Sequence, residues 1–158
     1  MSLDSVFEKY PTQESCIARL EKIRWSRRGP RCPHCRSVHV ARKKEKGRVG
    51  RWNCHRCKSS FNVLSGTVFQ NTKLPLQKWF FCLDLILNGT RVLSSHELGM
   101  HLKVSQPVAL LMQKRIEREV EAGGGRKLQK IIGRERRFFI RRIYRRPIYK
   151  RRGKPVIT

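Results

Sequence analysis

The chain has 158 residues, of which 37 are lysine or arginine and 11 are aspartate or glutamate, and its net charge is +26. This length accommodates one medium-sized domain or two or three very small ones. A compact fold with so much positive charge repels itself unless a polyanion neutralises it. A membrane is disfavoured as that partner, because the longest apolar stretch, 79–87, contains Asp84 and is too short to span a bilayer. Nucleic acid is therefore the expected partner.

The first element expected along the chain is a helix within the N-terminal segment 1–28. Thr12 can cap this helix, in which Cys16 and Leu20 recur at helical spacing. Cys16 is then a small buried hydrophobe and not a metal ligand. Residues 1–8 have neither the basic region nor the apolar core of a secretory signal. Free thiols and a metal site imply a reducing compartment, and a cytoplasmic location is expected.

The next segment, 29–70, contains two tight cysteine pairs, CPHC at 32–35 and CHRC at 54–57, in the pattern C-x2-C-x18-C-x2-C. This spacing is typical of a four-thiolate zinc site. Each C-x-x-C turn places two thiolates on one side of the backbone, and two such turns complete a tetrahedron with no open position for chemistry. A redox pair or a disulfide framework would need a βαβ pattern or a secreted context, which are not indicated. We predict one structural Zn²⁺, bound by Cys32, Cys35, Cys54 and Cys57.

Strand-like runs lie between and after the two cysteine pairs. The runs 38–42 and 49–53 flank a glycine-containing turn at 44–47, which predicts a β-hairpin. Residues 61–64 can supply a third strand. Together these features describe a zinc ribbon, in which the metal replaces a core too small to fold by itself.

The segment 71–122 is expected to form three helices. The first follows Pro75 and carries an apolar stripe at helical spacing. The second begins after Ser94, which forms a capping-box spacing with Glu97, and the third begins after Ser105. Two short helices joined by a tight turn, behind a longer helix, are the helix-turn-helix arrangement, although many small helical bundles share this pattern.

In a helix-turn-helix the second short helix presents its N-terminal part to the major groove of DNA. Spacing on this helix places Ala109, Met112, Ile116 and Val120 in the core. Glutamine can hydrogen-bond adenine, while lysine and arginine more often bind phosphate. For each single basic residue a solvated face is an equally good interpretation. The candidate DNA contacts are Ser105, Gln106, Gln113, Lys114 and Arg118 on the helix and Arg51, Arg56 and Lys58 on the ribbon.

The segment 123–158 is the most basic part of the chain, with 14 lysines and arginines against Glu135 alone. The three glycines at 123–125 predict a flexible linker, after which the tail is expected to be disordered. Aromatic residues interleave with arginine pairs in the tail, as in an arm that becomes ordered on nucleic acid. The alternative is an out-of-frame remnant, which would still bind DNA without specificity.

Short motifs in a fixed order extend beyond the cysteines, at 11–16, 24–25, 32–35, 51–57, 65–69, 72–79, 94–98 and 104–106. Together they resemble the N-terminal region of bacterial insertion-sequence transposases that open with a zinc ribbon, over about residues 5–121. The resemblance implies binding of double-stranded DNA at the terminal repeats of a mobile element. It also implies a bacterial, nucleoid-associated protein without a small-molecule substrate, whose further partners would be an intact transposase or another copy of the chain.

In the resembled family a catalytic domain with a ribonuclease-H-like fold follows this region. That domain uses three acidic residues to hold two divalent metal ions for strand cleavage and transfer. After Glu121 only Glu135 is acidic, and one carboxylate cannot build such a site. We therefore expect a truncated DNA-binding chain that is not an enzyme by itself. The loss of the family pattern at the same point favours the remnant interpretation of the tail.

Two departures from the family pattern bear on the fold and on DNA reading. Arg36 replaces the glycine usual after the first cysteine pair, which costs about 1 kcal/mol if the position requires a positive φ. Pro107 and Val108 stand where polar or basic residues are expected.

Two other functions fit the same residues. One is a free-standing transcriptional regulator with a zinc ribbon and a helix-turn-helix, and the other is a basic RNA-binding zinc protein. In each case the expected fold is a small α+β protein, with an N-terminal helix, a zinc ribbon, three helices and a basic tail.

Overall fold

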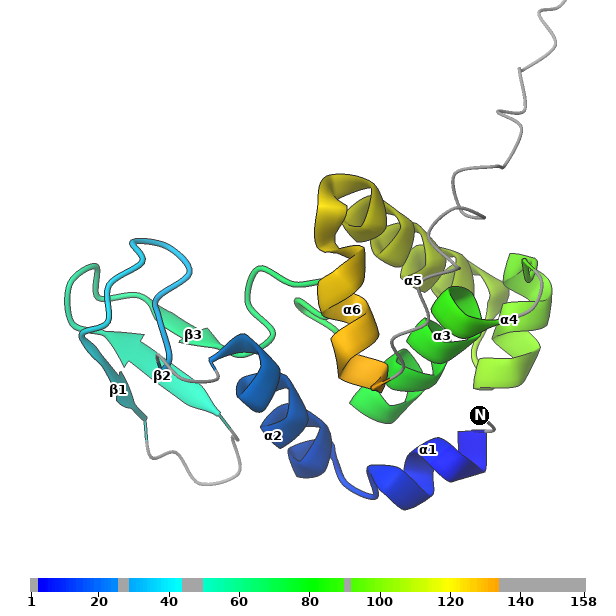
Figure 1. Cartoon of the computed structure of the whole chain (residues 1–158), viewed down its shortest axis with the longest axis horizontal. Coiled ribbons are helices and arrows are strands. Elements are labelled where there is room, and N and C mark those ends of the chain that lie inside the picture. The colour runs from blue at the N-terminus through cyan, green and yellow to red at the C-terminus, as the bar shows by residue number, and fades with distance from the viewer. Residues whose placement is uncertain (1–2, 26–28, 44–49, 90–91, 134–158) are drawn as a thin grey trace, which may run out of the picture.

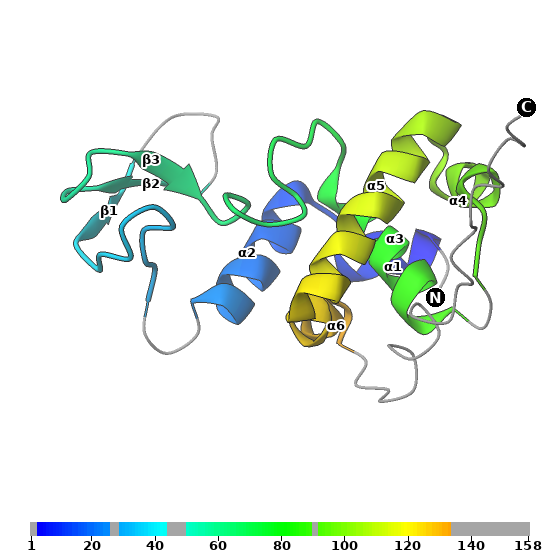
Figure 2. The same cartoon turned by 90° about the horizontal axis from the view of Figure 1, so that it is seen from above.

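A computed structural model describes residues 3–25, 29–43, 50–89 and 92–133 of the protein. A small β-sheet lies at one end and a group of helices at the other, with helix α2 between them in two perpendicular views (Figure 1, Figure 2). We call the sheet and its loops, residues 29–43 and 50–62, the ribbon, and the helices α1 to α6 the helical body. The expectations for the basic tail and for the hairpin turn at 44–47 lie outside the described residues. No helix in the described part of the chain is long and apolar enough to cross a membrane.

Two helices precede the ribbon, where the sequence predicted one. Helix α2 (Gln13–Arg24) begins at Thr12 as expected, and Ser15 completes a capping box, with its backbone N 3.2 Å from Thr12 Oγ1. Cys16 is fully buried, as predicted. Helix α1 (Leu3–Lys9) was not expected. It is held by Val6 and Tyr10, both buried, and the Tyr10 ring meets Phe80 edge-on with centroids 5.0 Å apart.

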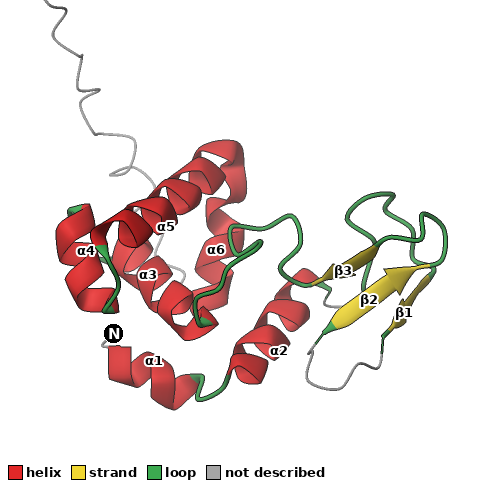
Figure 3. Ribbon diagram, turned by 180° about the vertical axis from the view of Figure 1, so that it is seen from behind, coloured by secondary structure: helices red, strands yellow, loops and turns green. Residues whose placement is uncertain are grey.

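The ribbon contains a three-stranded antiparallel sheet in the order β1 (Val40–Arg42), β2 (Arg51–Cys54), β3 (Ser60–Asn62). Figure 3 shows it apart from the other helices, next to α2. This confirms the predicted hairpin and third strand. The buried core of the ribbon consists of Cys32, Cys54 and Phe61 only. So small a core does not hold a chain folded unaided, so the ribbon depends on other constraints.

Helix α3 (Leu76–Asn88) is the centre of the helical body, and it packs against α1, α2, α4, α5 and α6. Trp79, Phe80, Leu83 and Leu87 on its apolar stripe are almost fully buried. Helix α4 (Ser95–Leu102) begins with the predicted capping box, in which the Ser94 backbone N lies 2.8 Å from Glu97 Oε2. The expected α+β architecture of helix, sheet and following helices is thus confirmed.

A three-residue turn joins α4 to α5 (Gln106–Glu119), and its geometry depends on Gly99. A Cβ atom at Gly99 would lie 3.0 Å from the carbonyl oxygen of Val104 and 3.7 Å from Ala109 Cβ. Glycine therefore lets the two helices approach closely. Lys103 ends α4 with φ of 51°, and its carbonyl oxygen accepts a hydrogen bond from Lys78 Nζ on α3 (2.9 Å).

The glycines at 123–125 are not a flexible linker, contrary to the sequence-based expectation. A kinked segment, η1 (Val120–Gly124), joins α5 to helix α6 (Gly125–Ile132), and Gly123 makes the bend with φ of 84°. Helix α6 returns to pack on α2 and α3. Burying Leu128, Ile131 and Ile132 accounts for this packing, because each large aliphatic side chain contributes about 1.5–3 kcal/mol.

The C-terminal end of α2 connects the helical body to the ribbon. Trp25 packs against both hydrophobic cores and meets Trp52 and Phe61 edge-on, with ring centroids 5.6 and 6.3 Å away. The neighbouring Arg24 Nη1 donates hydrogen bonds to the carbonyl oxygens of Val63 (2.5 Å) and Ser65 (2.7 Å), just after β3. Helix α2 is thus fixed to the exit of the ribbon.

Candidate metal centre and nucleic-acid surface

Four cysteine sulfurs converge in the ribbon. The Sγ atoms of Cys32 and Cys57 are 3.6 Å apart, those of Cys35 and Cys54 are 3.5 Å apart, and all four lie within 4.8 Å of one another. In a tetrahedral four-thiolate site with Zn–S bonds of about 2.3 Å the sulfurs are about 3.8 Å apart. The observed spacing fits zinc, whereas a disulfide requires about 2.05 Å.

The two cysteine turns have the same backbone conformation. The Cys32 amide donates to the carbonyl oxygen of Ser37 (3.0 Å), and the Cys54 amide donates to that of Ser59 (2.9 Å). In each turn the residue after the second cysteine is left-handed, with φ of 58° at Arg36 and at Lys58. The condition that the sequence left open at Arg36, a positive φ, is thus met, and Lys58 carries the same strain.

Replacement of Arg36 or Lys58 by glycine should stabilise the zinc-loaded protein by about 0.5–1 kcal/mol each, because glycine adopts this φ without a Cβ clash. Urea unfolding of the zinc-loaded protein measures the change. Arg36→Ala removes the same charge but keeps Cβ, so it should give no gain. Arg42→Gly, in the extended strand β1, should destabilise instead. Equal effects of Arg36→Gly and Arg42→Gly would contradict the strain argument.

Hydrogen bonding lowers the pKa of two of the four thiols. Burial acts to raise the pKa of Cys32, but hydrogen bonds with the Cys35 and His34 backbone and the Ser59 hydroxyl outweigh it and bring the pKa to about 6. The pKa of Cys57 is lowered, first by the Ser59 hydroxyl and then by the Ser59 backbone. These two thiols are prepared to bind metal as thiolates.

Cys35 has the opposite shift. A hydrogen bond with the Ser37 backbone acts to lower its pKa, but burial and the three neighbouring thiols raise the pKa to about 11. Negative charges this close cannot all persist without a cation. A bound dication removes the conflict, which is the chemistry expected of a closed thiolate site.

The same segment carries a recognisable family signature. Residues 11–60 match the transposase zinc-ribbon domain family. The four cysteines of this zinc ribbon therefore form the site of one structural zinc ion, as the sequence predicted. The match begins two residues before α2 and ends at Ser60, the first residue of β3, so it covers this helix together with β1 and β2.

A relative of known origin supports the same family. Over 64 residues the chain is 39% identical to an uncharacterized protein in transposable element ISH50 of Halobacterium salinarum. The aligned part is 40% of this chain and 21% of the relative, so the chain spans about a fifth of that protein's length. No solved structure matches the chain significantly. The sequence-based resemblance to the N-terminal part of a transposase is confirmed at the level of the zinc-ribbon domain.

Four of the five candidate contacts around helix α5 lie at its surface. Ser105, Gln106, Lys114 and Arg118 are exposed. Gln113 is only 6% exposed, and its side-chain amide donates to Glu117 Oε1 (3.0 Å). Position 113 borders the apolar stripe of α5 and is covered by the helical body, so Gln113 does not present its amide to a ligand outside the fold.

The three candidates on the zinc ribbon differ from one another in how they are held. Arg56 and Lys58 are exposed in the second cysteine turn. Arg51 is half-buried on β2, and its Nε donates to Ser60 Oγ (2.8 Å). The ribbon lies across α2 from α5 (Figure 2), so the structure does not bring the two groups of candidates into a single site.

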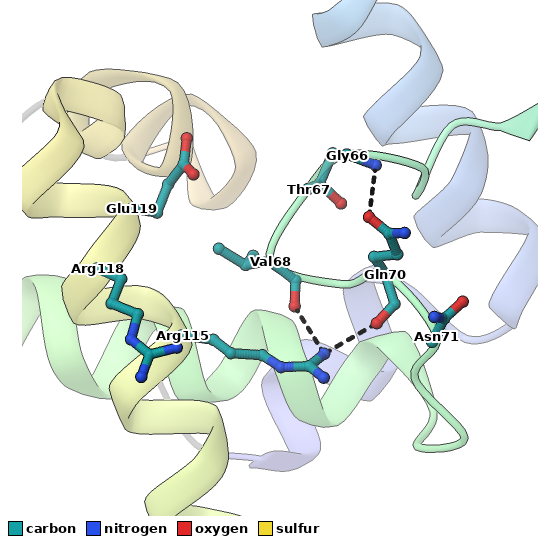
Figure 4. A pocket seen from close by; sticks show the side chains of 8 residues that line it. All are labelled: Gly66, Thr67, Val68, Gln70, Asn71, Arg115, Arg118 and Glu119. Atoms are coloured by element: carbon teal, nitrogen blue, oxygen red, sulfur yellow. Dashed lines mark hydrogen bonds between the residues drawn. The ribbon is translucent and has the colours of Figure 1, made fainter. Parts of the chain in front are cut away.

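A groove of about 400 Å³ lies between α5 and the loop 66–71, and the side chains that line it are drawn in Figure 4. Arg115 crosses it, with Nη1 donating to the carbonyl oxygens of Gln70 (2.9 Å) and Val68 (3.4 Å), and so holds the loop. Arg118 lines the same groove and is exposed. Sequence reasoning missed the role of Arg115, because nothing in the local pattern distinguishes an arginine that binds carbonyl oxygens from one that faces solvent.

Proposed function

We propose that this chain is a DNA-recognition part of an insertion-sequence transposase and binds double-stranded DNA at the terminal repeats of the element. The observation that carries the proposal is the combination of a transposase zinc ribbon with helix α5, which follows a tight turn and exposes Gln106, Lys114 and Arg118. The proposed role is binding. Strand cleavage belongs to the carboxylate domain that the resemblance implies, and a chain of this kind would compete with an intact transposase for the same ends.

The arrangement of α4 and α5 supports DNA binding as a helix-turn-helix. The turn is three residues long, Gly99 allows close packing, and α3 lies behind both helices. In such a motif the N-terminal residues of the second helix meet base edges. Ser105 and Gln106 occupy that position and are exposed. Next to them is a groove of about 460 Å³ lined in part by His96 and Met100 of α4.

Basic residues outside the start of α5 suit phosphate contacts. Lys114 and Arg118 lie two and three turns into α5, on its exposed side. Arg56 and Lys58 offer a second set of cations on the ribbon. Phosphate contacts position a protein on the duplex, while base contacts specify the sequence. We therefore propose that Gln106 contributes to sequence preference, and that these four cations contribute to affinity.

The proposal is tested by selection of duplexes from a random library with the full, zinc-loaded chain, followed by binding titrations of the selected DNA over a range of salt. The selected sequences should match the ends of a mobile element. Lys114→Ala and Arg118→Ala should weaken binding to all duplexes and reduce the slope of log K against log salt by about 1 each. Gln106→Ala should relax the preference at one base pair, a loss of about 1–3 kcal/mol in discrimination.

Lys22→Ala, an exposed position on α2, loses the same charge as Lys114→Ala and serves as the matched control. It should leave the salt slope nearly unchanged. Selection without any sequence enrichment would contradict the binding of terminal repeats. Equal slopes for Lys22→Ala and Lys114→Ala would contradict the placement of DNA on α5. Tighter binding of structured RNA than of the selected duplexes at equal salt would overturn the DNA assignment.

A further inference from the structure

Each cysteine turn is followed by a basic residue and a serine, Arg36-Ser37 after the first and Lys58-Ser59 after the second. The backbones of these two segments share a hydrogen bond from the amide of the first cysteine to the carbonyl oxygen of the serine, and a left-handed residue before the serine. The two serines therefore occupy equivalent positions relative to the metal centre. Any difference between them must come from the side chains.

The two hydroxyl groups make different contacts. Ser37 Oγ accepts a hydrogen bond from the backbone N of His39 (3.1 Å), which supports the chain as it enters β1. Ser59 Oγ instead lies 2.8 Å from Cys57 Sγ and 3.7 Å from Cys32 Sγ. Only the second turn thus directs its serine hydroxyl at the sulfur cluster.

Zinc binding fixes the direction of these hydrogen bonds. A cysteine that binds zinc is a thiolate and has no proton to donate, so the Ser59 hydroxyl must be the donor. A donor to a metal-bound ligand orients it and tunes its bond to the metal. The effect matters most at Cys57, which is exposed, whereas Cys32 is buried. The exposed thiolate is the one that water and competing ligands reach first.

We propose that Ser59 is a positioning residue of the zinc centre, whose hydroxyl donates a hydrogen bond to the Cys57 thiolate and a longer one to Cys32. The hydrogen bond keeps the exposed ligand on the metal and slows its exchange. Ser37, in the equivalent position, has no such role and acts on the backbone of β1. This inference concerns the metal centre alone and is independent of the proposed DNA binding.

Zinc affinity of the full chain provides the first test, measured by competition with a coloured chelator for Ser59→Ala, Ser59→Thr and Ser37→Ala. Loss of a hydrogen bond to a metal ligand typically costs 10- to 100-fold in metal affinity. We expect this loss for Ser59→Ala, a much smaller change for Ser37→Ala, and affinity close to the parent for Ser59→Thr, which keeps the hydroxyl. Equal losses in Ser59→Ala and Ser37→Ala would overturn the proposal.

Cobalt substitution separates hydrogen bonding from a general loss of stability, because it is read on the folded, loaded protein. In Co²⁺-loaded Ser59→Ala the sulfur-to-cobalt charge-transfer band should move to lower energy, since the thiolate keeps more electron density when no hydroxyl donates to it. The band should stay in place in Ser37→Ala and return in Ser59→Thr. An unchanged band in Ser59→Ala would contradict a hydrogen bond to the bound thiolate.

Discussion

Removal of zinc is expected to unfold the ribbon while the helical body remains folded. The hydrophobic core of the ribbon consists of Cys32, Cys54 and Phe61, whereas the helical body has a large continuous core built on α3. Structural zinc sites contribute apparent free energies of about 10–16 kcal/mol, far more than this small core could replace. Chelation, or the variant Cys54→Ser, should therefore abolish the sheet. Amide NMR spectra should lose dispersion for the ribbon residues and keep it for α3 to α6.

Thiol reactivity gives an independent measurement of the same event. After chelation the four ligand thiols should react with Ellman's reagent, while Cys16 and Cys82 should not. Burial raises the pKa of Cys16 to about 12 and raises that of Cys82 as well, so both remain unreactive thiols while the helices are folded. Cys16→Ala should still bind one zinc ion. Reaction of all six thiols in a single phase would contradict independent folding of the helical body.

Replacement of Trp79 by alanine is expected to destabilise the protein by about 3–5 kcal/mol, as for other large aromatic residues in cores. Trp79 is 2% exposed, and its ring meets Phe69 edge-on with centroids 5.6 Å apart. Its indole Nε1 donates to Thr72 Oγ1 (2.8 Å). The side chain thus joins α3 to the segment that leaves the ribbon. Guanidinium unfolding of the zinc-loaded protein, followed by circular dichroism of the helices, measures the loss.

Two further variants test this interpretation, one by separating packing from hydrogen bonding and one as a surface control. Trp79→Phe keeps most of the packing and loses the hydrogen bond to Thr72, so it should cost less than Trp79→Ala. Met100→Ala, at a side chain that is 63% exposed on α4, should change stability by less than about 0.5 kcal/mol. If Trp79→Ala were no more destabilising than Met100→Ala, α3 would not be the centre of the core.

The metal centre could be predicted from the sequence because its determinants are local. Two C-x-x-C turns at a permitted spacing specify the ligands, whatever the rest of the chain does. Helix starts at Thr12 and Ser94 were predictable for the same reason, since a cap is a contact between residues three positions apart. At Arg36 the sequence indicated only that a positive φ would be costly, and the structure supplies the φ itself.

The elements that the sequence did not reveal depend on distant partners. Helix α1 has seven residues and is anchored mainly by Val6 and Tyr10, too few for a recognisable period. Helix α6 does have an apolar stripe, Leu128, Ile131 and Ile132, but the three glycines before it indicated a linker. Gly123 instead supplies the bend that returns α6 to the body. The glycine pattern alone could not distinguish a flexible joint from a sharp, fixed one.

Residues facing a partner were harder to predict than metal ligands. Gln113 was a candidate DNA contact because glutamine can hydrogen-bond adenine. It is buried beside the apolar stripe, and the width of that stripe depends on how α5 packs on its neighbours. Ser59 was not a candidate, although the repeated Lys/Arg-Ser after each cysteine turn was visible in the sequence. Only the structure shows that its hydroxyl points at the sulfurs.

The position of Trp25 at the end of α2 has a consequence for how this module can be inherited. Its ring packs against Trp52 and Phe61 in the ribbon, while α2 belongs to the helical body. The neighbouring Arg24 donates hydrogen bonds to carbonyl oxygens that follow β3. A sheet transplanted into another protein without α2 would leave Trp52 and Phe61 uncovered. The smallest portable unit of the ribbon is therefore helix plus sheet, and recombination that separates the two would leave the core of the sheet open on one side.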